Sequence, residues 1–167
     1  VIPEGITKIG RNAFAGNNFS AINIPSTVTE IGAYAFSTKE YLTDPCTLTL
    51  PEGLTTIGSY AFRNKVIEEV SLPSTVTKLN ANTFTRTQSD IVTKVYVTSK
   101  EQYEDTKNFP TSNYHKLYLK DDAIWTAEDF TYGTEDFVLY PANEMEKKQT
   151  ISAHVVTGLS EQGMAKI

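Results

Sequence analysis

Apolar and polar residues alternate in short runs along the first half of the chain. The runs Ile22-Asn23-Ile24, Leu48-Thr49-Leu50 and Val70-Ser71-Leu72 are each followed by a proline, and the alternation returns at 95–97 and 117–119. A period of two is typical of a strand with one buried face. Proline ends such a strand because it has no N–H to donate to a neighbour. We therefore predict short strands that pair in parallel from one repeat to the next.

A longer unit begins at each of these prolines, and it occurs four times. The copies begin at Pro3, Pro25, Pro51 and Pro73 and read PEGITKIGRNAF, PSTVTEIGAYAF, PEGLTTIGSYAF and PSTVTKLNANTF. Their starts are 22, 26 and 22 residues apart. A period in this range is typical of a solenoid, in which one unit cannot bury its apolar face alone and stacks on its neighbours.

Two positions of the unit carry specific structural predictions. Gly32, Gly58 and Asn80 share one position, and these residue types tolerate positive φ, so we predict a left-handed corner there. Each copy closes on a phenylalanine, which we expect to point inward and stack from coil to coil. The four phenylalanines are Phe14, Phe36, Phe62 and Phe84.

Each unit runs in the order strand, proline, Ile-Gly and Ala-Phe. Over about residues 1–97 this order resembles the BspA-type leucine-rich repeat. The fourth copy departs from it, with Leu79-Asn80 in place of Ile-Gly and Thr83 in place of Ala. The resemblance implies a right-handed leucine-rich-repeat solenoid, β-rich, with short parallel strands and short helical turns. It also implies an extracellular or cell-surface location, since the family occurs mostly on secreted and surface proteins of bacteria and some protists, in adhesion and binding.

The repeat continues less regularly after the fourth copy. Degenerate coils occupy 93–120, so we expect the solenoid to span 1–120. Ser99 and Gln102 form the pattern of a capping box at the start of a short helix. The spacing between strands persists here while the residues expected to face the core change, which is typical of a terminal repeat.

The composition changes again at Asp121, where an aromatic-rich segment begins. We expect 121–167 to form a small β-rich spacer that ends in a short helix with Ser160 as its N-cap. The sequence of this segment is similar to the spacer that joins one block of these repeats to the next.

The 26-residue spacing comes from extra residues at 37–46. Insertions in solenoids usually extend as loops from one side of the coil. This loop is either a contact loop for a ligand or a neutral surface insertion, and we favour the neutral insertion.

The charge of the chain narrows the choice of partners. Its net charge is −5 and its sequence pI is about 5.1. Nucleic acid and anionic membranes require a basic surface, so neither is the expected partner. No apolar run approaches the ~20 residues that span a bilayer, so we expect no membrane insertion by this segment. The chain opens inside a repeat without a signal peptide, and we interpret it as part of a longer protein.

The sequence offers little catalytic chemistry. Cys46 is the single cysteine, which excludes an internal disulfide and a thiolate metal site. A nucleophile pair of Cys46 with His115 or His154 is conceivable, but no basic neighbour would lower the thiol pKa, so we favour a structural role. The outward strand positions carry one carboxylate, Glu69, instead of the acid–base pair of a polysaccharide-cleaving enzyme. We predict no catalytic residue, metal or cofactor.

The outward strand positions do suggest a binding surface. They change from small polar residues to Tyr96 and Tyr118, with Lys94 and Lys116 two residues earlier in each strand. The tyrosines either form an aromatic shelf for a ligand or cover the end of the core, and we favour the second interpretation. The lysines would suit an acidic glycan or protein.

We therefore expect a non-enzymatic binding or adhesion module that recognises a protein or glycan through a rigid solenoid face. The alternative is a structural stalk that carries another domain of a longer protein. A polysaccharide-acting enzyme is the disfavoured third reading, because the carboxylates it needs are missing from the strand face.

Overall fold

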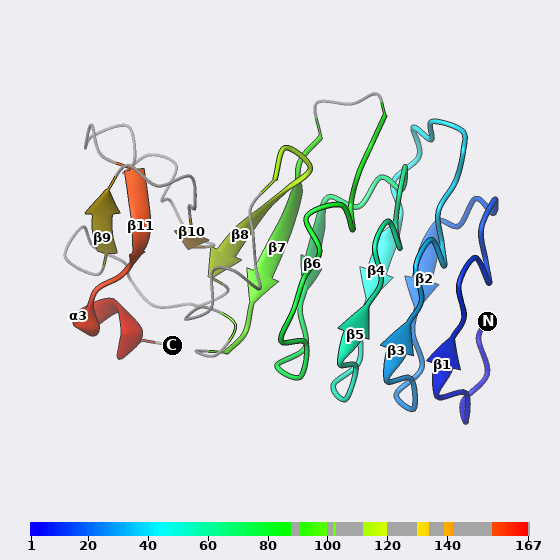
Figure 1. Ribbon diagram of the computed structural model, residues 1–167, viewed down its shortest axis with the longest axis horizontal. Helices are drawn as coiled ribbons and strands as arrows, with labels where there is room; N and C mark the ends of the chain where they lie inside the picture. Colours follow the sequence, from blue (N-terminus) through cyan, green and yellow to red (C-terminus); the bar gives the residue numbers. More distant parts are fainter. Residues whose placement is uncertain are drawn as a thin grey trace.

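The computed structural model describes residues 1–87, 91–99, 102, 112–119, 130–133, 139–141 and 155–166. Over these residues the repeats wind into a parallel-strand solenoid of about four turns with little helix (Figure 1). The second and third coils each run along one strand, turn after the proline and return along a second, shorter strand, and the first coil contributes the shorter strand β1 (Lys8–Ile9). Successive coils lie side by side along the long axis of the molecule.

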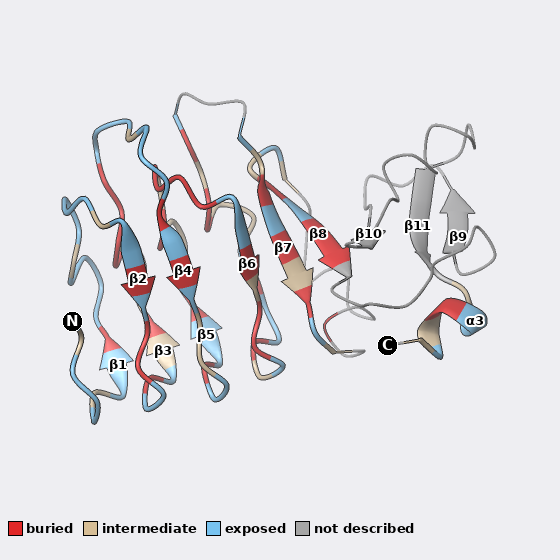
Figure 2. Cartoon of the chain, turned by 180° about the vertical axis from the view of Figure 1, so that it is seen from behind, coloured by how far each residue is buried: buried red, intermediate tan, exposed pale blue. Residues whose placement is uncertain are grey.

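The strands predicted from the alternating runs are present, and the first three begin one residue earlier than the apolar pattern. They are β2 (Ala21–Asn23), β4 (Thr47–Thr49), β6 (Glu69–Ser71), β7 (Thr93–Val97) and β8 (His115–Leu119). β2 pairs with β4, and β7 pairs with both β6 and β8, always in parallel. The central residues of β2, β4 and β6 are buried between more exposed neighbours, as Figure 2 shows, which confirms the predicted one-sided strands.

A second set of strands is not predicted by the apolar pattern. These strands are β1 (Lys8–Ile9), β3 (Glu30–Ile31) and β5 (Thr56–Ile57), and they form a parallel sheet in the order β1-β3-β5. Two residues are too few to show a period, so the sequence indicates only a turn here. The isoleucine of each strand is buried. The solenoid is therefore held by two ladders of hydrogen bonds.

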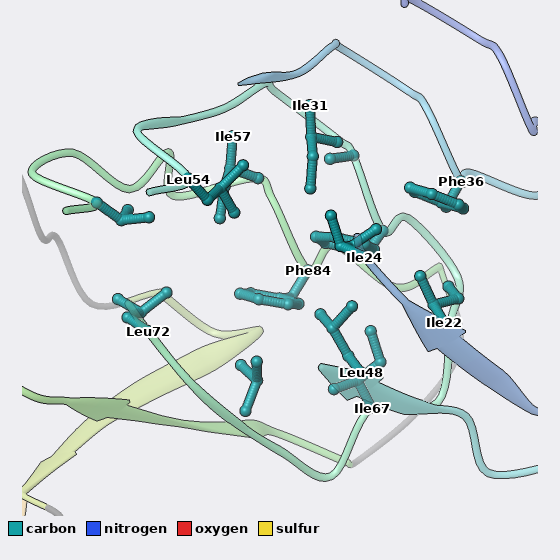
Figure 3. Close-up of a cluster of buried hydrophobic side chains, with 14 of the residues drawn as sticks. Ile22, Ile24, Ile31, Phe36, Leu48, Leu54, Ile57, Ile67, Leu72 and Phe84 are labelled. Carbon is teal, nitrogen blue, oxygen red and sulfur yellow. The ribbon is translucent and has the colours of Figure 1, made fainter. Parts of the chain in front are cut away.

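The four phenylalanines form the expected column through the core. Ring centroids of successive residues lie 5.2, 5.7 and 5.7 Å apart from Phe14 to Phe84, with interplanar angles of 10–14°. Phe36, Phe62 and Phe84 are buried, whereas Phe14 at the first coil is only partly buried. His115 ends the column, with its ring edge-on to Phe84 at 5.8 Å. Aliphatic side chains from both sets of strands surround the rings (Figure 3).

The predicted left-handed corner at Gly32, Gly58 and Asn80 is wrong. None of these residues has a positive φ. The left-handed residues lie two positions later in each of the first three copies: Asn12 (φ 59°), Tyr34 (φ 59°) and Tyr60 (φ 58°).

Glycine is needed at Gly32 and Gly58 because the preceding coil approaches too closely for a side chain. A Cβ on Gly32 would lie 2.6 Å from the amide nitrogen of Arg11, and one on Gly58 would lie 2.3 Å from that of Ala33. The same approach lets the amide of each glycine donate to a carbonyl of the coil before it, Gly58 to Ile31 at 2.8 Å. Close packing of coils, rather than backbone handedness, therefore selects glycine.

Neither sheet continues from the third coil to the fourth, although backbone hydrogen bonds such as that from Cys46 to Val66 at 2.7 Å still join the two coils. β5 is the last strand of its sheet, and β4 and β6 belong to different sheets. Asn80 occupies the glycine position of the fourth coil, and its side chain donates to the Ser59 hydroxyl at 2.9 Å and accepts from the Asn82 amide. An open groove lies between 55–57 and 77–80. The side chain of Asn80 thus prevents the close approach that the glycines allow.

The degenerate coil after the fourth copy is tied to the turn before it by Gln102. The amide of Gln102 donates to the Ser99 hydroxyl, as the capping box requires. Its side-chain oxygen accepts from the Thr98 amide at 2.7 Å, and its side-chain nitrogen donates to the carbonyls of Pro73 and Val76. Gln102 is completely buried. The helix expected after it lies outside the described residues.

The described part of the C-terminal segment contains three strands and one short helix. β9 (Phe130–Gly133) pairs antiparallel with β11 (Val155–Leu159), whereas β10 (Leu139–Pro141) pairs in parallel with β8. Helix α3 (Glu161–Met164) follows Ser160, whose hydroxyl accepts from the Gly163 amide at 3.2 Å, as expected for its N-cap. The proposed spacer thus contributes β10 to the sheet of the solenoid.

The phenylalanine column predicts a large loss of stability on truncation. We expect Phe36→Ala and Phe62→Ala each to lower the free energy of unfolding by about 3–5 kcal/mol, because each leaves a cavity between two aromatic neighbours. Urea denaturation measures this loss. Phe14→Ala, at the partly buried end of the column, is the matched control and should lose less. Losses under about 1 kcal/mol at both central positions would contradict a stacked core.

The close approach of the coils predicts opposite effects at two equivalent glycines. Gly58→Ala should destabilise by about 1–3 kcal/mol, because the new methyl group meets the backbone of Ala33. Gly10→Ala should be neutral or slightly stabilising, because nothing lies within 4 Å of a Cβ there and alanine restricts the unfolded chain. Equal effects of the two substitutions in thermal unfolding would show that coil contact does not select glycine.

Candidate binding surfaces

The four residues expected to form a binding surface lie together on β7 and β8. Lys94 is in register with Lys116, and Tyr96 with Tyr118. The two tyrosine ring centroids are 5.6 Å apart with an interplanar angle of 59°, and the Lys94 ammonium lies 5.4 Å from the Tyr118 centroid. Tyr96 is half-buried and both lysines are exposed, but Tyr118 is only 7% exposed. Tyr118 thus supports this surface more than it contributes contact area.

Glu69 of the neighbouring strand β6 completes the surface. The Tyr96 hydroxyl donates to its carboxylate at 3.4 Å. Burial raises the pKa of Tyr96, and the Glu69 charge raises it further. We call the group of Glu69, Lys94, Tyr96 and Lys116 the strand face.

The register extends the tyrosine row by one strand that sequence reasoning missed. The backbone of Tyr140 in β10 pairs with that of Tyr118 in β8. Tyr96, Tyr118 and Tyr140 are each separated by 22 residues, the same spacing as the repeat. This spacing is the signal that could have identified Tyr140. It is hard to recognise in the sequence because the other residues of the repeat unit do not recur after residue 120.

A second candidate surface lies at the insertion 37–46, between β3 and β4, at the opposite end of the coils from the proline turns (Figure 1). Buried polar side chains from the next two coils hold this loop in place. The Asn64 amide donates to the Thr38 carbonyl at 3.0 Å, and the Arg86 guanidinium donates to the Leu42 carbonyl at 3.2 Å. The Thr38 hydroxyl also donates to the Glu40 carbonyl. The insertion is therefore a fixed part of the structure.

The insertion forms one wall of a groove of about 620 Å³, which we call the insertion groove. Residues of the first coil also line it, and one lining residue, Arg63, belongs to the third. Its polar and aromatic lining residues include Asn12, Asn18, Tyr34, Lys39, Glu40 and Arg63. Arg63 is half-buried, and its side chain has no hydrogen-bond or ion-pair partner among the described residues. Sequence reasoning missed Arg63, because nothing in its local pattern distinguishes it from a solvated arginine.

Cys46 and Lys65 are buried close to the base of the insertion. Burial raises the pKa of the Cys46 thiol, an effect that the nearby Lys65 charge partly offsets. Burial also lowers the pKa of Lys65, whose ammonium donates to the Asn17 carbonyl and lies 5.3 Å from the Phe19 ring centroid. A raised thiol pKa disfavours a thiolate nucleophile.

The histidines do not complete a nucleophile pair in the described structure. His115 is fully buried in the aromatic column, with its Nδ1 3.0 Å from the Ser112 hydroxyl. His154 lies outside the described residues. Over the parts of the chain that the structure describes, no group of three or more His, Cys, Asp or Glu side chains could hold a metal ion. No described helix has the length and apolar character to cross a bilayer.

The chain belongs to the BspA-type leucine-rich repeat family. The sequence profile of this repeat matches residues 1–121 in six copies. The six copies include the degenerate coils as well as the four complete units. The family is generally surface-associated, and leucine-rich repeats are typically non-enzymatic scaffolds for protein interaction. Comparison with curated proteins and with solved structures gave no match.

Buried Lys65 predicts a distinctive dependence of stability on pH. The folded protein binds fewer protons than the unfolded chain between the lowered pKa of Lys65 and about 10.4, the ordinary value for lysine. Stability therefore rises with pH across this window. The raised pKa of Cys46 has the opposite effect above about 8.5, so a Cys46→Ala background removes it.

In that background we expect the free energy of unfolding to rise as the pH increases toward about 10, and to rise less when Lys65→Met is added. Denaturant titrations at fixed pH values measure both curves. Other titrating groups are common to the two proteins and cancel. The same slope in both would show that Lys65 keeps its ordinary pKa in the folded state.

Proposed function

We propose that this chain is a non-enzymatic binding or adhesion module of a cell-surface or secreted bacterial protein, and that the strand face contacts a protein or glycan ligand. The observation that carries the proposal is the arrangement on β7 and β8. Lys94 and Lys116 are exposed and in register, beside the half-buried Tyr96. The chain as a whole is acidic, so two adjacent lysines on one sheet favour an acidic ligand.

The mechanism we propose is recognition by a surface that does not change shape. The Tyr96 ring is held by the Tyr118 ring below it and by its hydrogen bond to Glu69. A side chain fixed before binding loses little conformational entropy when the ligand arrives. Tyrosine is favoured in recognition because it combines a large contact area with a polar tip.

A structural stalk is the second candidate function. The continuous phenylalanine column and the two ladders favour it, because they would make a stiff spacer between other domains. Binding by this chain alone separates the two candidates, since a stalk has no ligand of its own. An enzymatic role is disfavoured because Glu69 is bonded to Tyr96 and no second carboxylate occupies the described outward positions of β2, β4, β6, β7 and β8.

The strand face predicts which variants lose binding. We expect Lys94→Gln with Lys116→Gln to weaken retention on immobilised heparin or an acidic matrix protein by about tenfold, with an unchanged melting temperature. Tyr96→Ala should weaken it further. The matched control is Lys78→Gln, an exposed lysine away from this face. Wild-type binding that none of these variants reduces would move the ligand elsewhere, and no binding to any probe would favour the stalk.

A further inference from the structure

The insertion groove contains an arginine whose charge nothing in the described structure balances. Arg63 is half-buried, and its Nε is inaccessible to solvent and without a hydrogen-bond partner. Arginine is rarely withdrawn from water unless its five N–H donors are bonded. Arg86, one coil further on, also has a buried Nε without a partner, but its terminal nitrogens donate to the carbonyls of Lys65 and Leu42, whereas those of Arg63 have no partner among the described residues. Arg86 therefore has a structural role, whereas the donors of Arg63 remain available.

The charge around Arg63 favours an anion. Lys39 lines the same groove, is exposed and has no partner among the described residues. Glu40 lines the groove as well, but it forms no ion pair with Arg63 or Lys39; the ion pair that the structure gives joins Lys8 and Glu30. Two cations and one carboxylate leave the groove with a net positive charge on an acidic chain. A guanidinium binds a carboxylate through two parallel hydrogen bonds, which a solvated lysine does not provide.

The backbone of the groove disfavours the addition of a peptide strand. An extended peptide adds to a sheet edge through free main-chain groups. Here the amides of Asn12, Phe14 and Gly16 already donate to the carbonyls of the second coil, and the Thr38 amide donates to the Arg63 carbonyl. These amides are not available to a ligand, which favours recognition by side chains. Asn12 and Asn18, both exposed, offer planar amides of the kind that bond sugar hydroxyls.

We infer that the insertion groove is a binding site for an acidic saccharide, with Arg63 and Lys39 holding a sugar carboxylate. The volume of about 620 Å³ is sufficient for a few sugar units. The walls are fixed before binding, because Asn64 and Arg86 hold the insertion. This inference does not rest on the strand face. It assigns a ligand contact to the insertion, where the sequence alone favours a neutral loop.

Calorimetric titration with tetragalacturonate tests the inference. We expect the wild-type protein to bind it and to bind a neutral galactose tetramer at least tenfold more weakly. Arg63→Gln should reduce the affinity for tetragalacturonate at least tenfold, Lys39→Gln a few-fold, and Arg63→Lys should restore it only in part. Glu40→Gln should increase the affinity, because it removes a like charge from the groove. A melting curve for each variant shows that it is folded.

Two controls separate this site from the strand face. Lys78→Gln should bind tetragalacturonate as the wild-type protein does, and Arg63→Gln should reduce the affinity at least tenfold even when it is added to the double variant Lys94→Gln with Lys116→Gln. If the double variant lost binding of tetragalacturonate while Arg63→Gln kept it, the inference would be overturned and the strand face would be the site. Tetraglutamate that binds through Arg63 more tightly than the sugar would also overturn it, in favour of a peptide ligand. No binding of tetragalacturonate, or binding that Arg63→Gln leaves unchanged, would overturn it outright.

Discussion

The structure depends above all on the contact distance between successive coils. Phenylalanine rings that stack at 5.2–5.7 Å need the backbones of neighbouring coils to approach closely in the rest of the turn as well. Glycine at Gly32 and Gly58 allows that approach, and the hydrogen bonds of the second ladder follow from it. Polar bridges between the turns use the same spacing, as when Glu4 accepts from Ser26 and Glu52 accepts from Ser74. A single distance between coils thus allows both the packing of the apolar core and the hydrogen bonding of the backbone.

The exception at the fourth coil shows how sensitive this arrangement is. Asn80 replaces glycine there, and neither sheet continues across this point, although the Phe62 and Phe84 rings still stack at 5.7 Å. The aromatic column and the bridge from Glu52 to Ser74 connect the two halves of the solenoid across this break. Backbone hydrogen bonds also persist away from the Asn80 turn, from Phe62 to Thr83 at 3.1 Å and from Asn64 to Thr85 at 2.9 Å, so the separation of the coils is local.

The candidate binding surfaces occur where the repeat departs from its own pattern. The strand face lies on the degenerate coils, and the insertion groove lies where four extra residues lengthen one period. Positions that recur in every coil are occupied by core packing and by bonds between coils. Positions released from that task are available for a ligand, and in the insertion groove they bring variable residues of the regular units, such as Asn12 and Arg63, into the same site.

Short-range pattern was sufficient to predict the strands before each proline, the column from Phe14 to Phe84 and the family, because each depends on residues that repeat at a fixed spacing. The close approach at Gly32 and Gly58 could not be read from the sequence, since a glycine that avoids a clash and a glycine with positive φ look identical. The second ladder was missed because its strands are two residues long. The burial of Tyr118, the free guanidinium of Arg63 and the groove around it depend on which coil lies opposite which, and only the tertiary structure decides that.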